Sequence, residues 1–375
     1  MKRHLVKTTK RIISALISCV SLLFPLSVPI RVQASEPVTP CASEPTDMTI
    51  GYGSLISCSI EIGGDTDVFR FSSTGGERVV VQVTYQSGTM RPCIELIAPD
   101  SSSITACNNA FYNRIDTTLN QTGTYTVVAD VFFGGTTGNY SLALERLITP
   151  SPNAGAIQYG TTTANTLDAA GDLDVFFFTG EVNTTIRLRA TWQSGSMRPC
   201  MVLVIPNNDR LTACNNAFAN SIDTTLGQSG TYAILLTDWF STGTGSYALS
   251  IGRLLPPSPN AQPLQYGATT ISDINPIGDI DLFTFRGVTN TTVRIQASWQ
   301  SGSLRPCIEL IAPDNTRTTA CSNAFSNSID SALQQPGTYA VLVTDWFSTS
   351  TGNYGLTLQC LVGYCVNVYL PIIQK

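Results

Sequence analysis

Histidine is almost missing from this chain of 375 residues, and the one histidine, His4, lies in a segment that we expect to be removed. Without histidine, a chain has no Ser-His-Asp or Cys-His site of the usual kind and no histidine metal ligand. Lysine is also scarce, since only Lys375 follows residue 34. Six of the 21 basic residues and none of the 26 acidic residues lie before residue 35, which leaves a net charge of −11. We therefore expect no nucleic-acid partner, because phosphate contacts need a basic patch.

Helical periodicity is missing as well. Apolar and polar residues alternate in segments such as 293–299, 339–343 and 354–358, which is the pattern of half-buried strands. Glycine (29) and proline (20) are frequent, and turn signals recur between these segments. This combination predicts an all-β fold made of β-sandwiches or jelly rolls.

What the sequence does contain is one cassette, three times. Each copy reads Gln-Ser-Gly-x-x-Arg-Pro-Cys and later Cys-x-Asn-Ala-Phe, starting at Gln86, Gln193 and Gln300, at an interval of 107 residues. This period is too long for a solenoid unit, so each copy should be a domain with its own core. We predict three tandem β-sandwich (jelly-roll-like) domains of about 100 residues.

The expected organisation follows from these repeats and from composition. It comprises a signal peptide (1–34), an N-terminal arm (35–50), three sandwiches (51–147, 158–254, 265–361), two linkers (148–157, 255–264) and a tail (362–375). Both linkers are dense in proline, which favours extended polyproline II. We expect short, semi-rigid spacers and a rod of three beads.

The first 34 residues have a basic start, an apolar middle and the small-residue ending Val32-Gln33-Ala34, as in secretory signal peptides. An uncleaved membrane anchor and a lipidated Cys19 are the alternatives. After cleavage we expect no stable membrane span and a secreted protein that is either released or held at the cell surface. The apolar residues 368–374 are either a last strand or a surface-retention signal.

Ten cysteines follow the signal peptide, an even number that suits disulfides in a secreted protein. Within each copy, two cysteines flank a strand, a turn and a second strand, so their ends should meet across a hairpin. The remaining four sit only at the two ends of the chain, where a bond would pin a terminal arm. The predicted pairs are Cys93–Cys107, Cys200–Cys214, Cys307–Cys321, Cys41–Cys58 and Cys360–Cys365. Thiolate metal sites are the alternative, but Cys-x₂-Cys spacing is missing.

The order of motifs resembles a known family. Each copy runs Gly-Asp-x-Asp-x-Phe-x-Phe, then Gly-Thr-Tyr, then a Gly-x-Tyr-x-Leu strand, as at 278–285, 337–339 and 352–356. This order resembles the bacterial pre-peptidase C-terminal domain, a β-sandwich accessory module of secreted peptidases and other exported proteins. The resemblance implies a sandwich fold and export. The internal disulfide cassette departs from the usual pattern, and no peptidase domain accompanies the copies.

Paired aspartates open a strand in every copy. They share parity with core phenylalanines, but a core position disfavours an ionised carboxylate, so we expect them at the strand entrance. There they either cap the turn or bind calcium. Modules that resemble this family bind calcium near the N-terminal linker, which implies a possible calcium cofactor at these residues. The six candidates are Asp65, Asp67, Asp172, Asp174, Asp279 and Asp281.

Aromatic residues divide into two groups. Trp192 and Trp299 share the parity of the apolar face and are predicted to be core residues. Trp239 and Trp346, with Phe132 at the same place in copy one, have the opposite parity and precede a polar turn. Partly exposed aromatics of this kind suit stacking on sugars or protein side chains. Packing under a loop is the alternative.

The cassette arginines are interpreted as loop holders, with a ligand role as the alternative. Arg91, Arg198 and Arg305 are expected to bond to carbonyl groups or to Asp116, Asp223 and Asp330.

Three functions remain open. The first is a secreted, non-catalytic, multivalent adhesion protein that binds an extracellular polysaccharide or a matrix or cell-surface protein. The second is a structural stalk or surface-layer spacer without a ligand, in which Trp239 and Trp346 would be buried. The third is an accessory subunit of a secreted peptidase, or a carboxylate-based hydrolase. Glu95 and Glu309 occupy the same repeat position in copies one and three, but copy two has Val202 there. A shared pair of acidic residues therefore does not recur in this strand, and we expect no enzyme.

Overall fold

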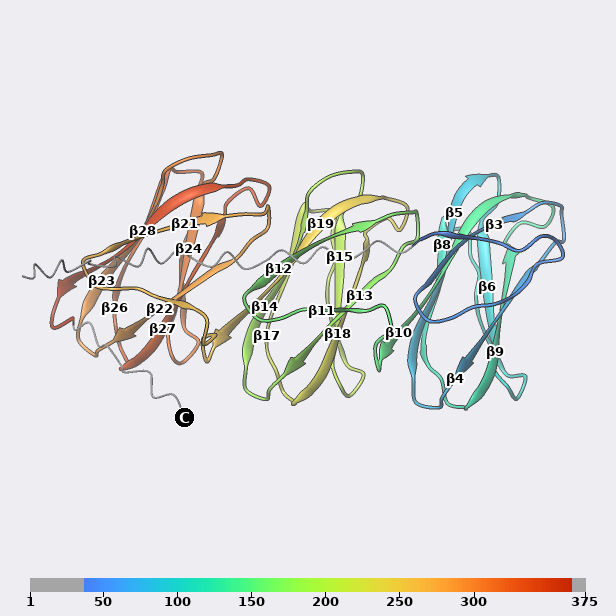
Figure 1. The fold of residues 1–375 in the computed structure, drawn as a ribbon, viewed down its shortest axis with the longest axis horizontal. Coiled ribbons are helices and arrows are strands. Elements are labelled where there is room, and N and C mark those ends of the chain that lie inside the picture. Colours follow the sequence, from blue (N-terminus) through green and yellow to red (C-terminus); the bar gives the residue numbers. More distant parts are fainter. Residues whose placement is uncertain (1–36, 366–375) are drawn as a thin grey trace, which may run out of the picture.

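The computed structural model describes residues 37–365, which form strands and connecting loops (Figure 1). A helix long and apolar enough to cross a membrane does not occur in this range. The predicted signal peptide and residues 368–374 lie outside the described residues.

The strands follow the repeat of the sequence. The first copy contains β1 (Thr39–Pro40), β2 (Asp47–Thr49), β3 (Ser54–Ile60), β4 (Asp67–Ser73), β5 (Arg78–Gly88), β6 (Pro92–Ile97), β7 (Ser103–Ala106), β8 (Tyr112–Thr118), β9 (Gly123–Val131) and β10 (Gly138–Ile148). The second contains β11 (Gly155–Ala156), β12 (Thr161–Leu167), β13 (Asp174–Gly180), β14 (Thr185–Trp192), β15 (Pro199–Val204), β16 (Arg210–Ala213), β17 (Ala219–Thr225), β18 (Gly230–Asp238) and β19 (Gly245–Leu255). The third contains β20 (Gln262–Pro263), β21 (Thr269–Ile274), β22 (Asp281–Gly287), β23 (Thr292–Trp299), β24 (Pro306–Ile311), β25 (Arg317–Ala320), β26 (Ser326–Ala332), β27 (Gly337–Asp345) and β28 (Gly352–Val362).

Six open sheets form three sandwiches, which confirms the predicted fold class. The first sandwich pairs sheet A (β1-β3-β10-β5-β8) with sheet B (β2-β4-β9-β6-β7). The second pairs sheet C (β11-β13-β18-β15-β16) with sheet D (β12-β19-β14-β17), and the third pairs sheet E (β20-β22-β27-β24-β25) with sheet F (β21-β28-β23-β26). Most neighbouring strands are antiparallel, and only the short strands β1, β2, β11 and β20 pair in parallel with the strands beside them.

Each sandwich has its own apolar core between its two sheets. The alternation of apolar residues along β4, β13 and β22 places two phenylalanines of each strand in the core, because successive side chains point to opposite faces. All five predicted disulfides are present. The three internal bonds join β6, β15 or β24 to the residue that directly follows the neighbouring hairpin strand, as the spacing indicated.

The linkers are turns, so the expectation of extended polyproline spacers is wrong. The Ser151 amide donates to the Arg146 carbonyl (2.9 Å), and its side chain accepts from the Arg146 amide (2.8 Å). Ser258 repeats the first of these bonds with Arg253 (3.1 Å). These bonds fold the chain back immediately after β10 and β19, and the sandwiches are drawn together.

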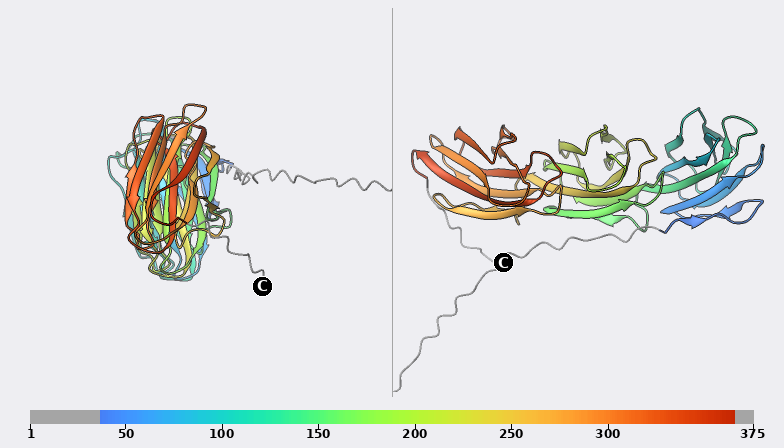
Figure 2. Two further views of the ribbon diagram at one scale, coloured as in Figure 1. Left: turned by 90° about the vertical axis from the view of Figure 1, so that its left-hand side faces the viewer. Right: turned by 90° about the horizontal axis from the view of Figure 1, so that it is seen from above.

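The sandwiches pack on each other through the outer faces of their sheets. At joint 1, sheet A lies on sheet C, and at joint 2, sheet D lies on sheet E. The joint 1 cluster is Leu55, Val80, Ala143, Leu147, Leu173, Val175, Val204, Ala233 and Leu235, and the joint 2 cluster is Leu254, Ile311, Ala340 and Leu342. The molecule is therefore one stack of six sheets in the order B, A, C, D, E, F rather than a string of separate beads (Figures 1 and 2).

Candidate functional site

The predicted site residues gather at one end of every sandwich. In the first sandwich, the loops 61–66, 89–91, 107–111 and 132–137 connect strands at the same end. The sandwiches stand in a row in similar orientation, and they lie behind one another in the end-on view (Figures 1 and 2). Equivalent loops therefore follow one long side of the molecule, which we call the loop edge.

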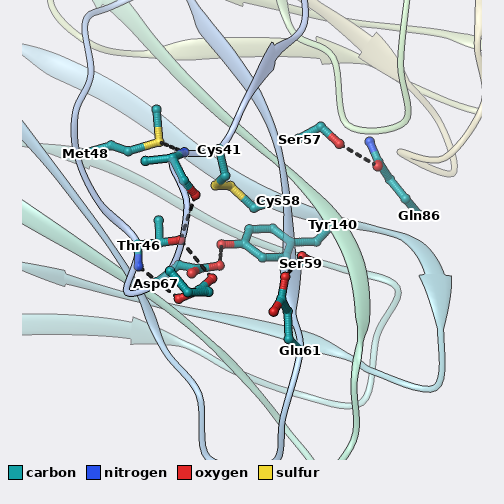
Figure 3. The surroundings of a disulfide bond; sticks show 12 residues. Cys41, Thr46, Met48, Ser57, Cys58, Ser59, Glu61, Asp67, Gln86 and Tyr140 are labelled. Carbon is teal, nitrogen blue, oxygen red and sulfur yellow. Dashed lines mark hydrogen bonds between the residues drawn. A yellow bond between two sulfur atoms is a disulfide. The ribbon is translucent and has the colours of Figure 1, made fainter.

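The second aspartate of each pair is the first residue of its strand, as predicted, but its side chain is bonded to a core tyrosine. Asp67 is fully buried and accepts a hydrogen bond from the Tyr140 hydroxyl (Figure 3). Tyr247 donates to Asp174 at 2.6 Å, and Tyr354 donates to Asp281. Burial raises the pKa of Asp67 to about 6, and burial and the nearby Asp279 charge raise the pKa of Asp281 to about 7.

The first aspartate of each pair caps the turn before the strand. Asp172 accepts from the amides of Asp168 (2.7 Å) and Leu173 (2.8 Å). Asp279 accepts from the Ile280 amide (2.9 Å) and from Thr162 of the second sandwich (2.6 Å). Within residues 37–365, the pairs of the second and third sandwiches are not joined by a third acidic or cysteine side chain close enough to share a metal ion.

The first sandwich differs because its N-terminal arm adds a third carboxylate. The Cys41–Cys58 disulfide pins this arm beside Asp67 (Figure 3), and carboxylate oxygens of Glu44, Asp65 and Asp67 lie within 4.8 Å of one another. Asp67 Oδ1 is buried and accepts no hydrogen bond. A hard cation with oxygen ligands fits this set.

The cassette arginines hold their loops through carbonyl groups, as predicted. Arg91 donates to the Met90 carbonyl (2.8 Å), and Arg198 and Arg305 do the same with the preceding residue. The predicted alternative partners are wrong, because arginines on the strands bind Asp116, Asp223 and Asp330 instead. Each cassette guanidinium also stacks on the phenylalanine ring four positions after the second cysteine of its cassette. The distances to the ring centroids of Phe111, Phe218 and Phe325 are 4.1, 4.2 and 3.8 Å.

The predicted aromatic residues are exposed on the loop edge. Phe132, Trp239 and Trp346 are 42%, 40% and 45% exposed, which is not the burial expected of a stalk. The expectation of a core position is wrong for Trp299, which is 37% exposed, while Trp192 is partly buried against its core. Trp192 and Trp299 are the last residues of β14 and β23. Their rings contact Phe218 and Phe325 edge to face, with ring centroids 5.1 Å apart in both pairs.

A cleft of about 560 Å³ opens on the loop edge where the first two sandwiches meet. The first sandwich contributes Tyr85, Gln86 and Phe111, and the second contributes Phe240 and Thr242 together with Ala169 and Ala170. Three aromatic rings with an amide and a hydroxyl at the margin offer stacking surface and hydrogen bonds, as in many ligand sites. A pair of carboxylates for acid–base chemistry does not line this cleft.

Tyr85 and Phe240 line the cleft but were not predicted as site residues from the sequence. Their signal was present in the repeat, since the next copies carry Trp192 and Phe347 at the same positions. Phe240 follows Trp239 directly, and only the first residue of each such pair was predicted to bind a ligand. What the sequence could not indicate is that Phe240 meets residues of the preceding sandwich.

Comparisons with known proteins give structural similarity only. A scan against family models found no match, and a search of curated proteins found none. The pre-peptidase C-terminal domain of a Bacillus anthracis collagenase is 19% identical and covers 30% of this chain and 99% of its own, with a TM-score of 0.23. The tandem CBM22 domains of Paenibacillus barcinonensis Xyn10C are 8% identical (54% and 99% covered, TM-score 0.17). A Clostridium perfringens ZmpB structure with a catalytic M60 domain and two CBM51 domains is 7% identical (80% and 34% covered, TM-score 0.15). Membership of the pre-peptidase C-terminal family stays a prediction.

Proposed function

We propose that this chain is a secreted, non-catalytic binding protein that holds an extended polysaccharide along its loop edge. The cleft between the first two sandwiches carries this proposal, because it joins three aromatic rings to an amide and a hydroxyl. Rings that are flat and rigid bind sugar faces with little loss of side-chain entropy. Five disulfides support an extracellular location.

Repetition increases the affinity of such a protein for a polymer. Exposed aromatic residues recur after β9, β18 and β27, at Phe132 and Phe133, at Trp239 and Phe240, and at Trp346 and Phe347. A polymer that contacts one group is already close to the next, so weak contacts add through effective concentration. The packed joints keep these groups on one side of the molecule.

The binding test is retention of disulfide-bonded residues 35–375 on insoluble cellulose, chitin and peptidoglycan, with collagen as a protein ligand. Wild type should be retained on one polysaccharide, and Phe240→Ala should lower retention at least about fivefold. A matched control is Tyr364→Ala, which removes an aromatic ring that is 86% exposed and lies at the other end of the chain from the cleft. Retention of Phe240→Ala equal to wild type would exclude the cleft, and retention on collagen alone would exclude a polysaccharide ligand.

A rigid spacer is the second candidate function. The apolar joints favour it, because Leu235 and Ile311 are fully buried between sandwiches and fix the direction of the stack. A folded chain that none of the four materials retains would leave this function as the better one.

For calcium, we propose a single site, formed by Glu44, Asp65 and Asp67. The three carboxylates repel one another when ionised, and one of their oxygens, Asp67 Oδ1, is buried without a hydrogen bond. A divalent cation would offset this repulsion. Millimolar calcium should raise the melting temperature of wild type above its value in chelator, and Glu44→Gln should reduce this rise. Asp209→Asn, in an exposed turn of the second sandwich, is the control and should keep it. Equal melting in calcium and in chelator would remove the site.

A further inference from the structure

Two sheet faces have no neighbouring sheet within residues 37–365. The outer face of sheet B begins the stack and occupies the position that sheets C and E occupy at the joints. The outer face of sheet F ends the stack and occupies the position of sheets A and D. Sheets A and D are equivalent to sheet F, and sheets C and E are equivalent to sheet B. The two joints therefore show how the outer face of a sheet like F packs on the outer face of a sheet like B.

Apolar residues of the joints are kept on these free faces. Leu147 and Leu254 are buried at joints 1 and 2, and Leu361 stands at the same repeat position on sheet F with 43% of its surface exposed. On sheet B, Val68, Ile97 and Val128 occupy repeat positions that are apolar and packed at both joints, but here they are only partly buried. Their joint 1 equivalents are Val175, Val204 and Leu235, and their joint 2 equivalents are Leu282, Ile311 and Leu342.

Two repeat positions that face each other across a joint are both apolar at joint 1 and oppositely charged at joint 2. At joint 1 the two positions are Val80 and Val202, which belong to one apolar cluster. At joint 2 they are Arg187 and Glu309, whose Nη1 and Oε2 atoms are 2.7 Å apart. On the free faces the same positions are Arg294 of sheet F and Glu95 of sheet B. The two ends of the chain thus carry opposite charges at positions that meet inside it.

Arg294 binds the aspartate that is equivalent to the partner of Arg187 at joint 2. Arg187 uses Nε to bind Asp223 (2.9 Å) and leaves Nη1 for Glu309 of the next sandwich. Arg294 uses Nε and Nη2 to bind Asp330 (both 2.6 Å), and its Nη1 has no ion pair among residues 37–365. Glu95 likewise forms no ion pair within this range, so neither group must give up a salt bridge to meet the other.

A turn carbonyl adds a second recurring contact. The Gly171 carbonyl accepts from Gln82 across joint 1 (3.3 Å), and the Gly278 carbonyl accepts from Ser250 across joint 2 (2.8 Å). These turns approach the neighbouring sheet closely: a Cβ at Gly171 would lie 2.5 Å from Thr84. The equivalent Gly64 has the same left-handed backbone (φ 89°) with open space around it. Sheet F carries Gln296 and Thr357 at the positions of the two donors.

We propose that the free face of sheet F binds the free face of sheet B of a second copy of this chain, head to tail. Such a contact is heterologous, so it leaves one free face at each end of the product and continues into an open filament. Ser103 stands on sheet B where joint 2 has Arg317, which binds both Glu309 and Asp223. The contact between chains is therefore weaker than joint 2, reversible, and sensitive to salt.

This association would also complete a binding site. The cleft at joint 1 needs Tyr85 and Phe111 from one sandwich and Phe240 from the next. Sheet F ends beside Trp299 and Phe325, and the first sandwich carries Phe133 at the position of Phe240. The junction between two chains brings these three rings to the same places. The association itself does not depend on the proposed ligand, and its test uses none.

The test is sedimentation velocity of residues 35–375 without ligand, over a wide range of protein and salt concentrations. The average mass should rise steadily with protein concentration and fall in high salt. Glu95→Arg and Arg294→Glu should each weaken association at least about tenfold, because like charges then meet. The double variant, and an equimolar mixture of the two single variants, should restore it. Glu181→Arg makes the same charge change at an exposed site away from both faces and should leave association unchanged.

Several results would overturn the proposal. Wild type could stay monomeric at all concentrations, or it could associate with the two charge reversals having no effect. Wild type could also stay monomeric while a shortened chain that ends at Cys365 associates. This result would mean that residues 366–375, and not a second copy, bind the face of sheet F. Circular dichroism of each variant checks the fold, and neither Arg294 nor Glu95 is a core residue.

Discussion

Each sandwich contains a carboxylate that is bonded to a core tyrosine. Asp67, Asp174 and Asp281 accept hydrogen bonds from Tyr140, Tyr247 and Tyr354, each 73 residues further along the chain. The bond ties the entrance of β4, β13 or β22 to the long strand of the opposite sheet. A buried carboxylate is stabilised by such a bond but is still costly when ionised.

The raised pKa of Asp281 predicts a pH dependence of stability. Its folded-state pKa of about 7 exceeds the ordinary value of 3.8, so the fold binds more protons than the unfolded chain between these values. The free energy of unfolding should therefore fall as pH rises from 4 to 7. Asp281→Asn cannot ionise, and urea unfolding across this range should show a shallower fall. Asp314→Asn is the control, because hydrogen bonds lower the pKa of that exposed carboxyl and the fall should persist. An equal slope for Asp281→Asn and wild type would contradict the expectation.

At the scale of the element, β18 is buried on both faces. Ile234 and Leu236 point into the core of the second sandwich, while Ala233 and Leu235 point into joint 1. This explains the continuous apolar run in β18, which is the pattern of a strand covered on both sides. β9 has the same place in the first sandwich, but its outer residues Thr126 and Val128 are only partly buried.

A matched pair of substitutions tests this difference. Leu235→Ala removes a fully buried side chain from joint 1 and should lower the free energy of unfolding by about 2–5 kcal/mol. Val128→Ala, at the equivalent position on the free face, should lower it by less than about 1 kcal/mol. Urea unfolding measures both, and small-angle scattering should show a larger radius of gyration for Leu235→Ala. Similar losses for the two variants would mean that joint 1 adds little stability.

At the scale of the whole molecule, local patterns predicted the sandwiches and the disulfides, because strand alternation and hairpin spacing depend on nearby residues. The joints depend on which faces meet, and no local pattern states this. Treating proline-rich linkers as extended spacers therefore gave separate beads, whereas Ser151 and Ser258 close turns that bring the sheets together. Trp299 was misplaced because strand parity continues to the last residue of β23, while the core beneath it has already ended. The exposed Trp239 and Trp346 followed from parity, but their cleft neighbours come from another sandwich.

The packed joints have a consequence for selectivity. Two sandwiches connected by a flexible linker could adjust the distance between their binding groups to suit a ligand of any length. Here the apolar contact of sheets A and C and of sheets D and E sets that distance. If the loop edge binds a polymer as proposed, a short oligomer would fill one aromatic group without reaching the next, because the joints within residues 37–365 fix the distance between the groups. The length of the ligand, as well as its chemistry, would then decide how tightly it is held.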